Sequence, residues 1–87
     1  MIIKPAKVYT LKRDIKVRKG AGLNCPQKLY SELTPKGRTN AYEQKYAVLK
    51  TGSKVVSIKV INNGKEVWLM TPDGYILAQT EKETYIC

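Results

Sequence analysis

Residues 55–78 have the sequence VVSIKVINNGKEVWLMTPDGYILA, and this stretch decides the fold. Its first seven residues are β-branched at five positions, which favours an extended strand. Asn62-Asn63-Gly64 can adopt the left-handed backbone of a tight hairpin. Thr71-Pro72-Asp73-Gly74 places proline second and glycine fourth, as a type I turn prefers. These signals predict a β-meander with strands at 55–61, 66–70 and 75–78.

The alternation within residues 55–61 also predicts which side chains are buried. Apolar residues at every second position of a strand occupy one face of its sheet, and that face is normally packed on the core. We therefore expect Val56, Ile58 and Val60 to face the core, and Ser57 and Lys59 to face water.

The N-terminal third of the chain is predicted to be extended as well. Residues 8–11 are followed by Ile15 and Val17, which alternate with Lys16 and Arg18. This alternation predicts a strand or strand pair with a cationic outer face. At the other end of the chain, residues 84–86 are expected to close the sheet as a short last strand.

Residues 23–46 differ from the rest and predict a long, decorated connection. Pro26 suits the first turn of a short helix that ends near Leu33, and Thr34-Pro35-Lys36-Gly37 is expected to break that helix. Short strands with turns about every eight to twelve residues predict an all-β fold, a small barrel or sandwich. The 87 residues suffice for one domain, residues 1–87. Because so small an interior has little room, we expect a ligand site outside, between loops.

Positive charge is concentrated in the first 50 residues. The chain has 16 basic and 7 acidic residues, a net charge of +9, and residues 1–50 contain twelve of the basic but only three of the acidic ones. Such a surface favours an anionic partner, such as nucleic acid, a wall polymer, acidic lipid or an acidic protein. Lysine-rich surfaces also serve solubility alone. The predicted basic patch consists of Lys12, Arg13, Lys16 and Lys19.

The composition argues against an enzyme. Histidine is absent, which excludes histidine-dependent catalysis and zinc sites that need imidazole. The seven carboxylates show no spacing typical of an acid–base pair. Cys25 and Cys87 belong to no CxxC motif, so neither a metal site nor a cofactor is expected, and we expect both to be unpaired thiols. The chain shows no export signal and no apolar run near the roughly 18 residues of a membrane span, which predicts no membrane insertion.

Several motifs resemble those of a known family. Residues 15–22, IKVRKGAG, resemble the LNVRSGPG opening of bacterial SH3 (SH3b) domains, and residues 49–55, LKTGSKV, resemble the family's LKKGTKV segment. Trp68 and residues 74–76 resemble its tryptophan strand and final GWV. Residues 30–38 resemble an insertion in the wall-targeting SH3 domains of phage lysins and N-acetylmuramoyl-L-alanine amidases. The family usually has asparagine, proline and tryptophan where this chain has Lys16, Ala21 and Tyr75.

The resemblance implies an SH3-like β-barrel that binds the Gram-positive cell wall without catalysis. The implied ligand is the peptide or cross-bridge of peptidoglycan, with anionic wall polymers adding attraction, in a groove between the long loop and the sheet. The implied groove residues are Tyr30, Tyr42, Tyr46, Trp68, Tyr75 and Arg18. Trp68 is equally compatible with the core, and Arg18 with bracing a loop through carbonyl groups. As part of a lysin the domain acts at the wall; otherwise phage or host cytoplasm is expected.

Two other functions are compatible with the sequence. The first is nucleic-acid binding by a small barrel, with tyrosines stacked on bases and phosphates along Lys12, Arg13, Lys16, Arg18 and Lys19. Against it, the basic strand has no interleaved aromatic residues. The second is a small stand-alone phage or bacterial protein that binds and inhibits a host protein, since SH3-like barrels serve many unrelated roles.

Overall fold

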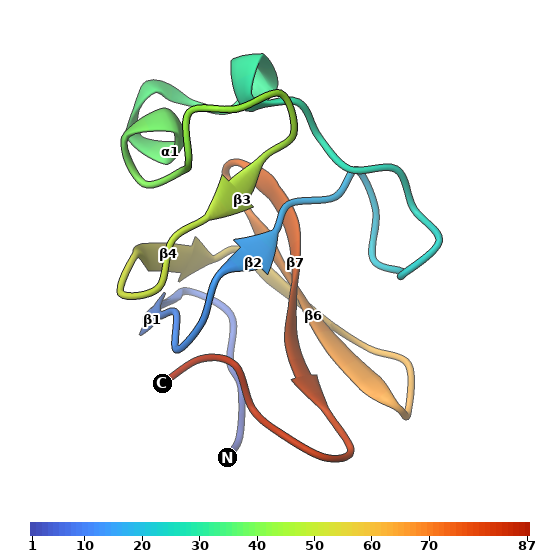
Figure 1. The fold of residues 1–87 in the computed structure, drawn as a ribbon. Coiled ribbons are helices and arrows are strands. Elements are labelled where there is room, and N and C mark those ends of the chain that lie inside the picture. The colour runs from blue at the N-terminus through green and yellow to red at the C-terminus, as the bar shows by residue number, and fades with distance from the viewer.

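The computed structural model describes all residues, 1–87, and confirms the all-β class. Strands dominate the chain, with one five-residue α-helix (Figure 1). A 3-10 turn at Tyr30–Glu32 precedes that helix, α1 (Pro35–Thr39). The strands are β1 (Lys7–Thr10), β2 (Ile15–Lys16), β3 (Val48–Leu49), β4 (Lys54–Ser57), β5 (Lys59–Asn62), β6 (Glu66–Thr71) and β7 (Gly74–Thr80).

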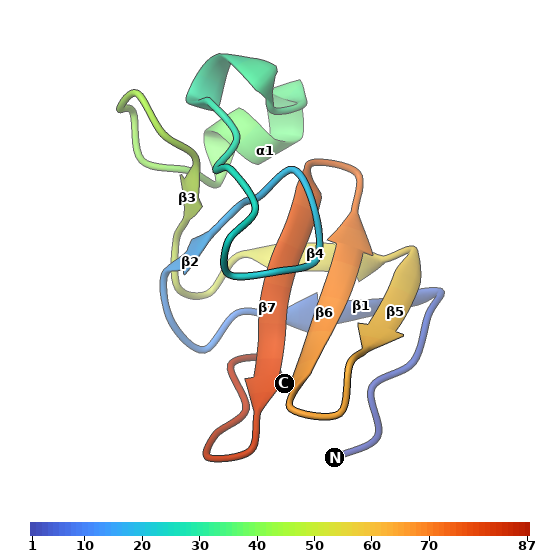
Figure 2. The ribbon, with the colours of Figure 1, turned by 90° about the vertical axis from the view of Figure 1, so that its right-hand side faces the viewer.

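The predicted β-meander is present as the antiparallel sheet β5–β6–β7. In the β5–β6 hairpin, Gly64 has a φ of 93°, and its N–H donates to Asn62 Oδ1 at 2.9 Å. The second turn ends at Gly74, whose φ of 136° favours glycine. Both turns therefore form at the residues predicted for them. Figure 2 shows the three strands side by side, with β1 and β4 running across behind them.

The predicted faces of residues 55–61 are wrong at three positions. Ser57 is fully buried, whereas Val56 and Ile58 are 41% and 49% exposed. The reason is that this stretch is two strands rather than one. Its first part is β4, in which Val56 is opposite Val8 of β1. At Ile58, whose N–H donates to the Met70 carbonyl at 2.8 Å, the chain passes to the other sheet, and the break reverses the alternation.

The faces predicted for the other two residues agree with the structure. Lys59 is exposed, and Val60, in β5, is half-buried and packs against the core. The two inward positions on either side of the break are therefore Ser57 and Val60, three residues apart. An unbroken strand would separate its inward positions by an even number of residues.

The C-terminal residues pair with β7 on one side and with β1 and the residues after it on the other. The Tyr85 N–H donates to the Ala78 carbonyl of β7, and the Tyr85 carbonyl accepts from the Lys12 N–H, both at 2.8 Å. Cys87 and Thr10 exchange two further backbone hydrogen bonds, which places the C-terminus beside β1 (Figure 1). Residues 84–86 thus pair with the sheet, as expected, through single bridges instead of a regular strand. The SH3-like barrel stays a prediction.

One cluster of buried hydrophobic residues lies between these strands. Its members come from both ends of the chain and from the middle, and every strand except β5 contributes to the core or lies next to a contributor, while β5 packs against the cluster through the half-buried Val60. The cluster consists of Tyr9, Leu11, Ile15, Val17, Leu33, Ala41, Ala47, Leu49, Val55, Leu69, Ile76, Ala78 and Ile86.

The helix in the long connection does not begin where the sequence predicted it. No helix starts at Pro26; instead α1 begins at Pro35, inside the segment expected to break a helix. The Thr34 side chain caps it by accepting a hydrogen bond from the Gly37 N–H at 3.0 Å. Pro35 is the first helical residue, where its missing N–H costs nothing. Residues 34–37 were predicted to end a helix that comes before them, and instead they form the first turn of a helix that follows.

The turn between β6 and β7 holds α1 against the sheet. Asp73 Oδ1 accepts hydrogen bonds from the Thr34 N–H at 2.7 Å and the Thr34 hydroxyl at 2.8 Å. Gly37 lies so close to this carboxylate that a Cβ at its position would clash with Asp73. Gly37 is therefore required by close packing and not by its backbone angles.

We predict that Gly37→Ala lowers the free energy of unfolding by about 1–3 kcal/mol, because the added methyl group overlaps the Asp73 carboxylate. Urea denaturation measures the change. In an Asp73→Ala background, which removes the obstacle, the same substitution should cost clearly less. An equal cost in both backgrounds would contradict the steric explanation.

A second prediction concerns the buried hydroxyl of Ser57, which has no hydrogen-bond partner. Because an unpaired buried polar group costs about 1–3 kcal/mol, Ser57→Ala should leave stability unchanged or raise it by about 1 kcal/mol. The matched control is Ser53→Ala, since buried Ser53 donates to the Asn40 carbonyl at 3.3 Å. The control should lose about 1 kcal/mol in thermal denaturation. A larger loss for Ser57→Ala than for the control refutes the prediction.

Candidate ligand-binding cleft

A cleft of about 240 Å³ lies beside β2 and the outer face of β6 and β7. Its lining combines apolar side chains with three cations and one carboxylate. In Figure 2 the loop of residues 19–27 passes in front of β7, on the side away from β1 and β4. The lining residues are Arg13, Asp14, Ile15, Lys16, Arg18, Leu23, Trp68, Leu77 and Tyr85.

Two other hollows of similar volume lack this combination. One, of about 270 Å³, lies beside residues 1–3 and Val60, and no charged side chain lines it. The other, of about 260 Å³, is polar, and Val67 is its one apolar residue. The cleft beside β2 is therefore the candidate site, since ligand pockets typically join an apolar surface to a few polar groups.

Trp68 and Leu77 form the floor of this cleft. They are directly opposite each other in the β6–β7 ladder, after a register shift between Val67 and Trp68. Opposite residues share a face, so both point away from Leu69 and Ile76, which face the core. Trp68 is only 1% exposed, although it is not part of the core cluster. The tryptophan is thus buried and also contributes to the cleft.

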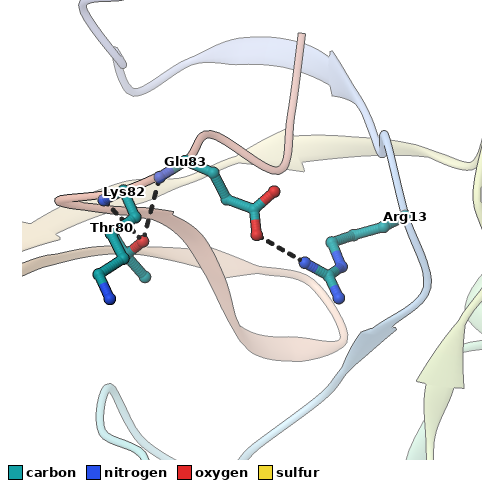
Figure 3. Close-up of polar contacts among 4 residues, drawn as sticks. All are labelled: Arg13, Thr80, Lys82 and Glu83. Atoms are coloured by element: carbon teal, nitrogen blue, oxygen red, sulfur yellow. Dashed lines mark hydrogen bonds and ion pairs between the residues drawn. The ribbon is translucent and has the colours of Figure 1, made fainter.

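The first cation, Arg13, is held by the C-terminal segment. Its Nη1 is 3.0 Å from Glu83 Oε1, and its guanidinium lies over the Tyr85 ring, 4.8 Å from the ring centroid. Thr80 Oγ1 accepts hydrogen bonds from the N–H groups of Lys82 and Glu83, which fixes the turn that carries Glu83 (Figure 3). Both members of the ion pair remain about half exposed, so the pair mainly orients Arg13.

The second cation, Arg18, braces the loop above the cleft. Its Nη1 donates to the Cys25 carbonyl at 2.9 Å, and its backbone pairs with Tyr75 through two hydrogen bonds. The loop packs tightly, because a Cβ at Gly20 would be 2.9 Å from Cys25 Sγ. Leu23, 57% exposed, stands at the rim. The structure therefore shows the bracing role for Arg18, and both cysteines are free thiols.

The third cation, Lys16, is exposed, and its ammonium group takes part in no hydrogen bond or ion pair. The one carboxylate of the lining, Asp14, is fully engaged elsewhere. It accepts hydrogen bonds from the Thr51 N–H and hydroxyl, both at 2.9 Å, and from the Tyr42 hydroxyl at 2.8 Å. Hydrogen bonds from the Thr51 N–H, the Tyr42 hydroxyl and the Thr51 hydroxyl lower the pKa of Asp14. Lys16 is therefore the cation of the cleft that a ligand can pair with.

Most of the residues predicted for the groove do not meet in one cleft. Arg18 and Trp68 line it, together with Arg13 and Lys16 of the predicted basic patch. Tyr42 reaches its edge only through the bond to Asp14, while the other predicted residues lie outside the lining. Those residues are Tyr30, whose ring packs against the core, the exposed Tyr46, the half-buried Tyr75, Lys12, and Lys19, which is 3.9 Å from Glu32.

Besides Asp14, the lining includes four residues that were not predicted from the sequence to belong to a site: Ile15, Leu23, Leu77 and Tyr85. Leu77 carried a usable signal, since it alternates with Ile76 and Ala78 and must face away from them. No sequence signal marks Leu23 or Tyr85. Leu23 reaches the cleft from a loop and Tyr85 from the end of the chain, and neither approach follows from a local pattern. Asp14 is one of seven carboxylates, and nothing in the sequence distinguishes it from the other six.

No family model, no curated protein and no solved structure matches this chain. The resemblance to bacterial SH3 domains therefore stays a prediction. No helix has the length and apolar character needed to cross a bilayer. No group of three or more histidine, cysteine, aspartate or glutamate residues is placed to hold a metal ion.

The Asp14–Tyr42 hydrogen bond predicts that the stability of the protein depends on pH and decreases at both the acidic and the alkaline extreme. Accepting this hydrogen bond, the carboxylate raises the pKa of Tyr42. The bond's contribution to stability is therefore complete below the ordinary tyrosine pKa of about 10 and is lost as pH rises through the raised value. The lowered pKa of Asp14 acts in the opposite sense: its contribution is present above about 3.8 and disappears as pH falls through the lowered value.

Tyrosinate absorbance during alkaline titration tests this assignment. Tyr42→Phe should remove the last-titrating step, and Asp14→Asn should move that step to lower pH. Tyr46→Phe is the control, since the Tyr46 hydroxyl bonds to no carboxylate, and it should leave the last step in place. An unchanged last step in Tyr42→Phe would show that another tyrosine titrates there.

Proposed function

We propose that this chain is a non-catalytic module that binds the Gram-positive cell wall through a peptide component of peptidoglycan. The sequence resemblance suggests the target. The observation that carries the proposal is the cleft, in which the unpaired ammonium of Lys16 lies beside an apolar lining that includes Leu23 and Leu77. Such a site suits a ligand that has both an anionic group and small apolar groups.

The chemistry of wall peptides matches this description. Stem peptides of peptidoglycan carry carboxylates between short alanine side chains, so they offer anionic and small apolar groups at neighbouring positions. A carboxylate can form a charge-assisted hydrogen bond with Lys16, while a methyl group can cover part of Leu77 or the edge of Trp68. Arg13 and Arg18 add positive potential without needing to release their own partners.

Long-range attraction and the cleft have different parts in this proposal. The net charge of +9 favours approach to a wall rich in anionic polymers, and salt screens that attraction. Contacts inside the cleft act over short distances and are screened less. Wall binding is therefore expected to weaken with salt without vanishing.

Co-sedimentation with purified Gram-positive walls, before and after removal of teichoic acid, tests the proposal. The wild-type protein should sediment with both preparations. Binding should weaken between about 0.01 M and about 1 M salt, over which the Debye length falls from about 30 Å to about 3 Å. Lys16→Glu should lower the apparent affinity for stripped walls about tenfold or more, because it replaces the free cation by a negative charge that repels the anionic ligand.

The matched control is Lys59→Glu, which changes net charge equally. Lys59 is exposed in β5, the opposite edge strand of the sheet from β7, and is not part of the cleft lining. Its affinity for stripped walls should change less than about twofold at high salt. Absence of wild-type sedimentation on any wall, or equal losses for the two variants, would contradict the proposal.

A further inference from the structure

The cleft offers one cation for a new contact and holds two others in place. Arg13 is paired with Glu83 at 3.0 Å, and Arg18 is bonded to the Cys25 carbonyl at 2.9 Å. Lys16 has neither kind of partner. Because Thr51 and Tyr42 already donate hydrogen bonds to both Asp14 oxygens, Lys16 is the one charged side chain of the site that has no hydrogen-bond or ion-pair partner, and it is positive.

The cleft is small. Its volume of about 240 Å³ is below the roughly 300 Å³ at which pockets for drug-sized ligands begin. Leu23 at the rim and Leu77 with Trp68 at the floor provide its apolar contacts. A cleft of this size suits one or two residues of a peptide, and not a long segment of chain.

We infer that the cleft recognises the free carboxylate at the end of a peptide chain, with Lys16 as its ion-pair partner and the last apolar side chain between Leu23, Leu77 and Trp68. This inference rests on the proposed function, since it specifies which part of a wall peptide is bound. The bound part is an open peptide end, and not a cross-bridge in which that carboxylate has become an amide.

A chain end fits better than a polyanion for two reasons. A polyanion binds through a row of free cations that follow successive phosphates. Here Lys12 and Lys19 do not line the cleft, and Lys19 is 3.9 Å from Glu32. A phosphate backbone has no apolar group to pack on the floor of the cleft, whereas a terminal alanine or larger aliphatic residue covers that floor.

The test compares two probes that differ only in the terminal group. They are diacetyl-L-lysyl-D-alanyl-D-alanine, a soluble stem-peptide analogue with a free carboxylate, and its C-terminal amide. Isothermal titration calorimetry measures both affinities. Emission of Trp68 gives a second readout, because it is the protein's only tryptophan and lies at the floor of the cleft.

The free acid should bind about tenfold to a hundredfold more tightly than the amide, as expected when a hydrogen bond to a charged group is lost. Lys16→Gln should reduce binding of the acid by a similar factor and leave binding of the amide nearly unchanged. Lys59→Gln serves as the matched control and should bind both probes as the wild type does. Circular dichroism of both variants confirms that they are folded.

Any of four results would overturn the inference. Equal affinity for acid and amide, or undiminished acid binding by Lys16→Gln, would show that the terminal charge is not recognised. Absence of acid binding by a protein that still sediments with stripped walls would leave wall binding intact but place it elsewhere. Tighter binding of oligothymidine than of the acid would favour a nucleic-acid ligand, and failure to sediment with walls would separately reject the proposed function.

Discussion

The register of the β6–β7 hairpin is the constraint on which the cleft depends. Its turn pairs Thr71 with Gly74, and the pairing continues without interruption through Leu69 with Ile76 to Trp68 with Leu77. Because Leu69 and Ile76 face the core, Trp68 and Leu77 face the outside of the sheet, and the register shift comes only after them, at Val67. The sheet is therefore apolar on both faces, and the outer one needs other segments to shield it from water.

Those other segments also determine which charges remain free. The loop of residues 19–27 is tied down by Arg18, and the C-terminal turn is tied to Arg13 through Glu83. Each of these cations is thus used to hold a covering segment in place. Lys16 lies in β2, between Arg13 and Arg18 in the sequence, and its side chain holds no covering segment in place. Arg13 and Arg18 are already ordered and contribute their positive charge without a further loss of conformational entropy, whereas the Lys16 side chain loses rotamer freedom when it pairs with a ligand.

An all-β fold of this size supports many functions, so fold class alone is a weak guide to function. The features of the site that suit the proposed peptide ligand are one unpaired ammonium, an apolar floor and a small volume. In the proposed function, the excess of positive charge in residues 1–50 acts at longer range and favours approach to anionic surfaces. Charge distributed over a surface mainly affects encounter, whereas the proposed role of the cleft is to select the ligand that is retained.

The sequence by itself determined the β6 and β7 strands, the two glycine turns at Gly64 and Gly74, the all-β class and the basic first half, because each depends on residues close together in the chain. The faces of Val56 and Ile58 were decided only by the tertiary structure, since the chain changes sheets between β4 and β5. The start of α1 depends on Asp73, which bonds to Thr34 from 39 positions away. The cleft is likewise tertiary: Leu23, Leu77 and Tyr85 come from segments that local patterns cannot bring together, because the contacts that join them form only when the chain folds.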